Sequence, residues 1–191
     1  MRNIRQVLIV ALAAFTLTAC AQKMGSPQPS MSTLEAVRAT DIPAMRVGTF
    51  ALAPGLPASM DRSIGSRSVS LEPPEGSLAK YLATTLETDL RLGGKLDPNA
   101  DLVLEGLLTA SDLDTGMSTG NGKLGAKFSL KRGGKSIFEK DLLVTAQWDS
   151  SFLGAVAIPE AINQYTTLYD KLAAALFADG DFKIAVKSPP K

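Results

Sequence analysis

The residue types that enzymes most often use for acid–base and metal chemistry are scarce in this chain. Its 191 residues include one cysteine and no histidine, which excludes a Ser-His-Asp or Cys-His pair and any imidazole metal ligand. A single cysteine also allows no internal disulfide and no cysteine cluster for zinc or iron–sulfur. The formal net charge of +1 argues against a nucleic-acid partner. The sequence therefore predicts a protein that is not an enzyme and that holds no cofactor or metal.

Two short motifs have the spacing of known binding loops but lack their context. Residues 120–125 (GNGKLG) match the G-x-G-x-x-G pattern of dinucleotide sites, yet they open an alternating strand pattern, so no helix N-terminus would meet a phosphate. We interpret them as a hairpin loop. Asp97, Asn99 and Asp101 have the spacing of calcium ligands, but leucines stand at the sixth and twelfth positions, where that loop needs glycine and glutamate. We expect a turn there and no calcium.

Four acidic residues near strand ends could form carboxylate pairs: Asp112 with Asp114, and Glu139 with Asp141. Paired carboxylates at a defined separation can hydrolyse glycosidic bonds. No motif places either pair in a cleft, however, and a raised carboxyl pKa needs burial. Ser150 and Ser151 have no histidine or nearby lysine to act as a base. We therefore expect solvated acids and no activated nucleophile.

The single cysteine, Cys20, ends a segment with the layout of a secretory signal peptide. Arg2 and Arg5 precede an apolar run, residues 7–18, that is shorter than the ~20 residues of a bilayer-spanning helix. We therefore expect residues 1–19 to be removed as a leader. Residues 17–20 (LTAC) resemble the lipobox of bacterial lipoproteins. The resemblance implies cleavage before Cys20 and a diacylglycerol on its thiol.

The residue after the cysteine bears on the destination of such a protein. Lipoproteins that stay in the inner membrane usually have aspartate at this position, whereas this chain has Ala21. The resemblance therefore implies a lipid-anchored protein of the outer membrane, with its domain facing the periplasm. Two or three acyl chains are enough to hold such a protein firmly.

The rest of the chain divides into a short polar segment and one domain. Residues 20–44 are rich in serine, proline and glutamine and show no sustained periodicity, which predicts a lipidated, flexible tether. Residues 45–187 predict a single domain. We expect strands over 45–52, 67–71, 101–109, 124–130 and 136–148, and amphipathic helices over 77–92 and 159–178. Gly133-Gly134 predicts a hairpin turn. The fold class expected is α+β, an antiparallel-rich sheet of about five strands with both helices on one face.

One strand-to-helix connection, residues 148–158, is unusually apolar. Such connections normally run over the surface, so its apolar side chains must either cover the edge of the core or contact a partner. Both interpretations stay open. Our hypothesis is that Phe152 and Leu153 are at least partly exposed and, with Trp148, contact another envelope protein or a second copy of the chain.

A broader resemblance rests on pattern. Residues 99–114 (NADLVLEGLLTASDLD), the alternating hairpin that follows and the helix over 159–178 resemble the auxiliary lipoproteins of ABC-type lipid transport systems. Lipoprotein activators of peptidoglycan synthases, and the lipoprotein partner of the lipopolysaccharide translocon, have comparable layouts. The resemblance implies a non-catalytic accessory module of an envelope transport or assembly system, and no site beyond Cys20. The alternative is a lipoprotein that binds a lipid or small ligand, which would need an apolar pocket between sheet and helices.

Overall fold

Two mixed β-sheets and five helices form the part of the chain that the computed structural model describes, residues 20–39, 42–67 and 69–188. The elements, in chain order, are β1 (Cys20–Lys23), α2 (Met31–Ala39), β2 (Arg46–Leu52), α3 (Ser59–Arg62), β3 (Ile64–Ser66), β4 (Val69–Glu72), α4 (Leu78–Leu92), β5 (Leu102–Thr115), β6 (Thr119–Arg132), β7 (Lys135–Asp149), α5 (Gly154–Ala178) and α6 (Gly180–Lys187). The α+β class is as predicted. The leader predicted over residues 1–19 lies outside the described residues.

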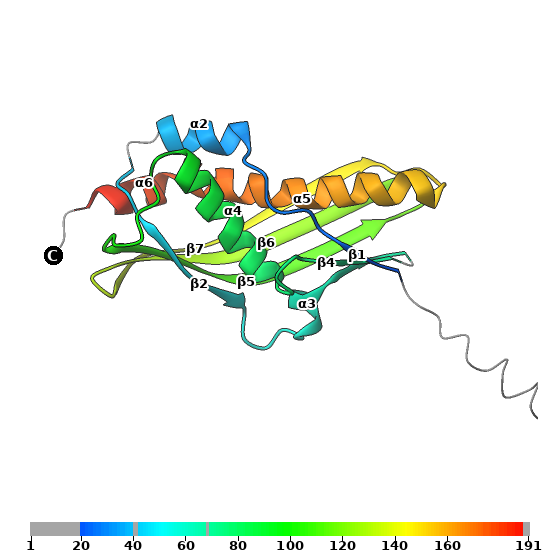
Figure 1. Ribbon diagram of the computed structural model, residues 1–191, viewed down its shortest axis with the longest axis horizontal. Helices are drawn as coiled ribbons and strands as arrows, with labels where there is room; N and C mark the ends of the chain where they lie inside the picture. The colour runs from blue at the N-terminus through cyan, green and yellow to red at the C-terminus, as the bar shows by residue number, and fades with distance from the viewer. Residues whose placement is uncertain (1–19, 40–41, 68, 189–191) are drawn as a thin grey trace, which may run out of the picture.

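The larger sheet has the strand order β2-β5-β6-β7. Strands β5, β6 and β7 pair antiparallel along nearly their whole length, whereas β2 pairs in parallel with β5. Leu104, Leu124 and Phe128 face the helices and are fully buried, while lysine and serine side chains alternate with them on the other face. Figure 1 shows α2, α4, α5 and α6 on one side of this sheet. Both predicted helices therefore cover the same face.

The sheet arrangement differs from the predicted one in two respects. The described chain has seven strands in two sheets, not about five in one, and each sheet contains a parallel pair. The extra strands are short, and three-residue or four-residue segments give too few alternations for a period of two to be recognised. The three long strands also extend beyond their predicted bounds, because polar residues on an open sheet face continue a strand without any apolar signal.

The predicted hairpin turn joins β6 to β7. Gly133 and Gly134 have φ angles of +55° and +79°, and Arg132 pairs with Lys135 across them. Positive φ at both central residues is typical of a two-residue turn whose twist matches that of the flanking strands, and glycine adopts it without steric strain.

The interpretation of residues 120–125 as a hairpin loop is wrong, because these residues lie inside β6 and the loop is at 116–118. Their glycines serve packing. A Cβ on Gly120 would lie 2.2 Å from Cε2 of Trp148, and one on Gly122 would lie 3.0 Å from Leu168. The indole of Trp148 therefore needs glycines beneath it in β6, because any side chain there would occupy the space of its ring. Interpreting the glycines as a loop missed this packing role.

The two long helices begin differently. Helix α4 begins as predicted, with the Ser77 hydroxyl accepting from the Lys80 N–H at 3.1 Å. Helix α5 begins at Gly154, five residues before the predicted start, and contains Pro159. The proline removes one backbone hydrogen bond near the helix start, but the apolar residues that precede it are compatible with helix. Four or more turns of α5 then pack large side chains, among them Tyr165 and Leu172, against the sheet.

The segment expected to be a flexible tether is part of the fold over residues 20–39. Strand β1 pairs in parallel with β4, with Cys20 opposite Val69, and the smaller sheet has the order β1-β4-β3. Helix α2 packs on α4 and α5 through Leu34 and Val37, both buried. The prolines that suggested a tether lie in the connection between β1 and α2, so they interrupt neither element.

The larger sheet leaves one face without a helix layer in the described part of the chain. Within those same residues, no helix combines the length and the apolar character needed to cross a membrane.

Candidate functional site

The exposed apolar side chains gather where the β5–β6 loop meets the connection from β7 to α5. Met117, Phe152, Leu153 and Val156 are 73%, 72%, 63% and 58% exposed, and we call these four residues the loop patch. The two segments are adjacent, since the Ser150 N–H donates to the Ser118 carbonyl at 2.9 Å. The expected exposure of Phe152 and Leu153 is therefore found. Whether they contact a partner stays a prediction.

Trp148 does not belong to this surface, contrary to the hypothesis. It is 9% exposed and belongs to the core, where its ring lies over Gly120 and Gly122 of β6. Its position in the strand explains this, because Trp148 continues the inward-facing alternation of Leu142, Val144 and Ala146. The side chain is therefore part of the scaffold that places the loop patch.

Arg67 fixes the geometry of the loops that carry the patch, and sequence analysis missed it. Its guanidinium donates to the carbonyls of Thr115 and Gly116 in one loop, each at 3.0 Å, and to those of Ser151 at 3.0 Å and Phe152 at 3.2 Å in the other. Arg67 has a φ of +54°, a conformation that non-glycine residues rarely adopt. Four hydrogen bonds from a charged donor offset this strain, so Arg67 holds both loops to the turn before β4.

Cys20 lies at the same end of the molecule as the loop patch. It is the first residue of β1 and pairs with Val69, the first residue of β4. Arg67 precedes Val69 by two positions and reaches both loops with its side chain. Figure 1 shows the start of β1 and the start of α5 at the same end. The backbone of the predicted lipidation residue and the loop patch thus lie at the same end of the molecule.

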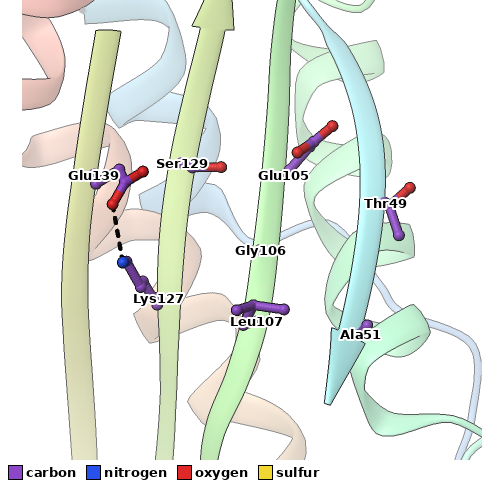
Figure 2. Close-up of a pocket in the computed structure, with 8 residues that line it drawn as sticks. All are labelled: Thr49, Ala51, Glu105, Gly106, Leu107, Lys127, Ser129 and Glu139. Atoms are coloured by element: carbon purple, nitrogen blue, oxygen red, sulfur yellow. Dashed lines mark ion pairs between the residues drawn. The ribbon is translucent and has the colours of Figure 1, made fainter. Parts of the chain in front are cut away.

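A second candidate region is a shallow pocket of about 250 Å³ on the open face of the larger sheet. Figure 2 shows its lining side chains from β2, β5, β6 and β7, with Lys127 and Glu139 paired across neighbouring strands. Their Nζ and Oε2 atoms are 2.9 Å apart, and Lys131 pairs with Glu105 at 2.6 Å. The lining mixes small, apolar and charged side chains, and the charges lie in ion pairs that neutralise one another. Among the described residues, no group of acidic or cysteine side chains could hold a metal ion.

The four acidic residues considered from the sequence lie in two separate regions of the larger sheet. The hydrogen bond from Lys127 lowers the pKa of Glu139, so this carboxyl stays ionised near neutral pH and cannot donate a proton. Asp112 lies opposite Lys123, whereas Glu139 lies opposite Ser129, six residues further along β6. Asp114 and Asp141 are exposed in the same strands as these two. The structure therefore brings neither pair toward the other.

The two serines of the connection differ in what their hydroxyls contact. The Ser151 hydroxyl accepts from the Leu153 N–H at 3.1 Å. The Ser150 hydroxyl is buried and has no hydrogen-bond partner within the described residues. Asp97 accepts from the Asn99 N–H at 2.9 Å, so the expected turn is present.

A third region, which sequence analysis missed, is an acidic seam between α4 and α5. Asp89 on α4 is fully buried, and no side chain of the described residues donates a hydrogen bond to its carboxyl oxygens. Burial raises its pKa to about 7, the Asp170 charge adds to the effect, and the Ser30 amide opposes it. Burial also raises the pKa of Asp170 on α5 to about 6. The sequence feature that could have revealed this seam is Asp89 itself, which stands three residues after Leu86 in the apolar stripe of a helix.

Tyrosines continue this seam toward the sheet. The Tyr165 hydroxyl lies 2.8 Å from that of Ser111 and 3.1 Å from that of Tyr169, and the ring of Tyr81 meets that of Tyr169 edge to face at 4.8 Å. Desolvation raises the pKa of Tyr81 and of Tyr165 to about 12. A groove of about 360 Å³ runs beside the seam under residues 25–28. The tyrosine hydroxyls therefore stay neutral at physiological pH, and those of Tyr165 and Tyr169 act as structural hydrogen-bond partners.

The comparisons with known proteins concern the fold. No family model matches the chain, and no curated protein matches it. Among solved structures, it is similar to a Xanthomonas campestris protein assigned to the family model DUF330, at 12% identity and a TM-score of 0.53, over 82% of this chain and 94% of that one. The two share a fold. At this identity the likeness shows nothing further.

Two other structures are more distant. A Caulobacter crescentus protein provisionally described as a lipoprotein has 15% identity and a TM-score of 0.46, with 83% of this chain and 99% of that one covered. A minor lipoprotein of Acinetobacter baumannii has 14% identity and a TM-score of 0.35, with 70% and 90% covered. These TM-scores are too low to carry a structural argument.

Proposed function

We propose that this chain is an envelope lipoprotein, acylated at Cys20, that acts as a non-catalytic accessory module of a transport or assembly system. The observation that carries the proposal is the sequence of residues 17–20 (LTAC) at the end of a charged and then apolar leader. The only cysteine of the chain stands where acylation needs a thiol. Outer-membrane destination and a periplasmic orientation are part of the proposal and rest on Ala21, as argued from the resemblance.

The non-catalytic role is supported by what the side chains do in the fold. The chain has no histidine, and Glu139 is held ionised by Lys127. The buried carboxyls of Asp89 and Asp170 lie in a seam between helices, and Asp89 is fully enclosed. A catalytic acid must reach a substrate atom, and Asp89 reaches none from this position.

The alternative, binding of a lipid or small ligand, ranks second. It calls for an apolar cavity between sheet and helices. Large core side chains, including Phe128, Tyr165 and Leu172, fill that layer with no exposed surface. The groove beside the acidic seam is open to solvent, whereas an acyl chain is held best in an enclosed apolar cavity.

Anchorage is tested with the full chain expressed in a Gram-negative host. Wild type should yield a mature protein that begins at Cys20, carries acyl mass on its first residue and sediments with outer membranes. Cys20→Ala should remain uncleaved at that bond or become soluble. Gln22→Ala, an exposed change in the same strand, should behave as wild type. Normal processing and membrane fractionation of Cys20→Ala would exclude the anchor.

The accessory role needs a separate test. Crosslinking in intact membranes should join the wild-type chain to a component of a transport or assembly system, and Cys20→Ala should lose this product. A purified chain that turns over a hydrolase or transferase substrate, with turnover abolished by Asp112→Asn or Glu139→Gln, would replace the accessory role with an enzymatic one.

A further inference from the structure

Half of the large hydrophobic side chains exposed in the described residues belong to the loop patch. The others occur singly on separate elements: Met31 on α2, Leu92 on α4, Leu143 on β7 and Ile184 on α6. Single exposed hydrophobic residues are normal on a protein surface, whereas a contiguous group indicates contact with something apolar. The loop patch therefore needs an explanation that the other four residues do not.

The exposed residues of the patch do not serve the stability of the fold. Leu153 is the residue before the first turn of α5, and it provides no side-chain hydrogen bond to that turn. Serine, threonine, aspartate or asparagine at this position would stabilise a helix. The eight residues from Phe152 to Pro159 contain no charge, although several are exposed. Solubility and helix capping would both favour polar residues here, so the apolar character points to an external contact.

The position of Cys20, directly after the predicted leader, indicates that the bilayer is what the loop patch contacts. The predicted leader, residues 1–19, ends directly before Cys20, and the backbone of Cys20 is already paired in β1, so no flexible segment separates the acylated residue from the fold. The start of β1 lies beside the start of β4, and Arg67 joins that point to the carbonyls of Ser151 and Phe152. Acyl chains on Cys20 would consequently hold this end of the domain, and the loop patch with it, at the lipid surface.

The charges around the patch favour an apolar contact over an electrostatic one. The guanidinium of Arg67 is occupied by four backbone carbonyls. Asp114 and Asp149, the nearest acids in the flanking strand ends, are exposed. Anionic headgroups would gain nothing from this arrangement, so the contact should persist at high salt and should not require anionic lipid.

We propose that the loop patch inserts its apolar side chains into the interfacial layer of the bilayer that holds the acyl chains of Cys20. This inference rests on the proposed function, because it takes the acyl anchor as given. It assigns the patch a membrane partner and gives the domain a fixed orientation, with the start of β1 and the start of α5 toward the lipid. Helix α6 then points away from the membrane (Figure 1).

The experiment uses the acylated full-length protein purified from membranes. Acylation occupies the thiol of Cys20, so Phe152→Cys introduces one free thiol for an environment-sensitive fluorophore. The matched control is Ile184→Cys, which replaces a side chain of nearly equal exposure, 69% against 72%, on α6 at the other end. Both proteins are reconstituted into phosphatidylethanolamine–phosphatidylglycerol vesicles with and without brominated acyl chains, at low and at high salt.

The proposal expects blue-shifted emission and loss of fluorescence to brominated lipid at position 152, unchanged by salt, with water-like and unquenched emission at position 184. Equal, water-like emission at both positions in an acylated protein would overturn it. A blue shift at 152 that appears in detergent without lipid and grows with protein concentration would overturn it in favour of a second copy. The mass of the mature chain distinguishes failure of the proposed function from failure of the membrane contact. A chain without acyl mass refutes the proposed function, whereas an acylated chain with an unquenched label at position 152 refutes the membrane contact alone.

Discussion

Asp89→Asn should stabilise the protein at pH 8 and leave its stability almost unchanged at pH 4. Asp89 is buried, no described side chain donates a hydrogen bond to its carboxyl, and its pKa in the folded chain is about 7 against an ordinary value of 3.8. At a pH between these two pKa values, the unfolded chain has released the Asp89 proton and the folded chain has kept it. The folded state therefore binds more protons, and its free energy of unfolding falls as the pH rises from about 4 to about 7.

The size of the effect follows from the shift. A rise from 3.8 to about 7, at roughly 1.4 kcal/mol per pKa unit, corresponds to roughly 4 kcal/mol. Helix α2 covers this part of α4 as a single layer, and its residues Met31, Ser32 and Glu35 are exposed. Because water beyond that layer screens the charge, we halve the figure and expect about 2 kcal/mol at pH 8. Asparagine resembles the neutral acid in size and polarity, so the variant should equal wild type at pH 4.

Urea unfolding of the mature protein at pH 4, 6 and 8 measures this directly, with the slope against urea compared between variants to check two-state behaviour. Asp114→Asn, an exposed change on β5, is the control and should follow wild type at all three pH values. Asp170→Asn should give a smaller gain in the same direction, because desolvation also raises the pKa of Asp170. If Asp89→Asn gains no more stability at pH 8 than at pH 4, then the Asp89 carboxyl is hydrated in the folded protein and the reasoning fails.

Two further predictions concern the packing of the sheet, and thermal unfolding measures both. Gly120→Ala should destabilise the fold by about 1–3 kcal/mol, because its Cβ would lie 2.2 Å from the ring of Trp148, whereas Gly65→Ala should be near neutral since a Cβ there meets nothing within 4 Å. Phe128→Asp should cost about 4 kcal/mol or more by burying an unpaired charge at a fully buried position, while Thr145→Asp on the open face should have little effect. A Phe128→Asp protein that melts with wild type would contradict the assigned core.

Local signals predicted the elements that depend on local chemistry. The turn at Gly133-Gly134 and the cap at Ser77 could be identified because a positive φ and an orphan helix N–H each demand particular residue types. The alternation of Leu124 to Leu130 likewise identified the central strand and its buried face. These features need no knowledge of the rest of the chain.

Features that depend on distant contacts could not be predicted. Residues 20–23 form a strand only because β4 offers them a partner, and α2 is too short to be recognised without the helices that cover its three buried side chains. Trp148 could be assigned to the surface or the core until its pairing with Gly120 was known. Arg67 is one exposed arginine among many charged residues, and only the fold shows that four carbonyls converge on it.

The position of Cys20 at the start of a paired strand has a mechanical consequence. A pull on acyl chains at this residue acts along β1, and the four register pairs from Cys20–Val69 to Lys23–Glu72 lie side by side across that line. Backbone hydrogen bonds between parallel strands run across the strand direction, so such a load shears all of them together and does not open them one after another. Force on the anchor would pass through β4 into the body of the domain. Resistance to extraction would then be governed by the rate at which the small sheet unfolds, and substitutions that weaken the pairing of β1 with β4 would lower the rupture force without altering the lipid.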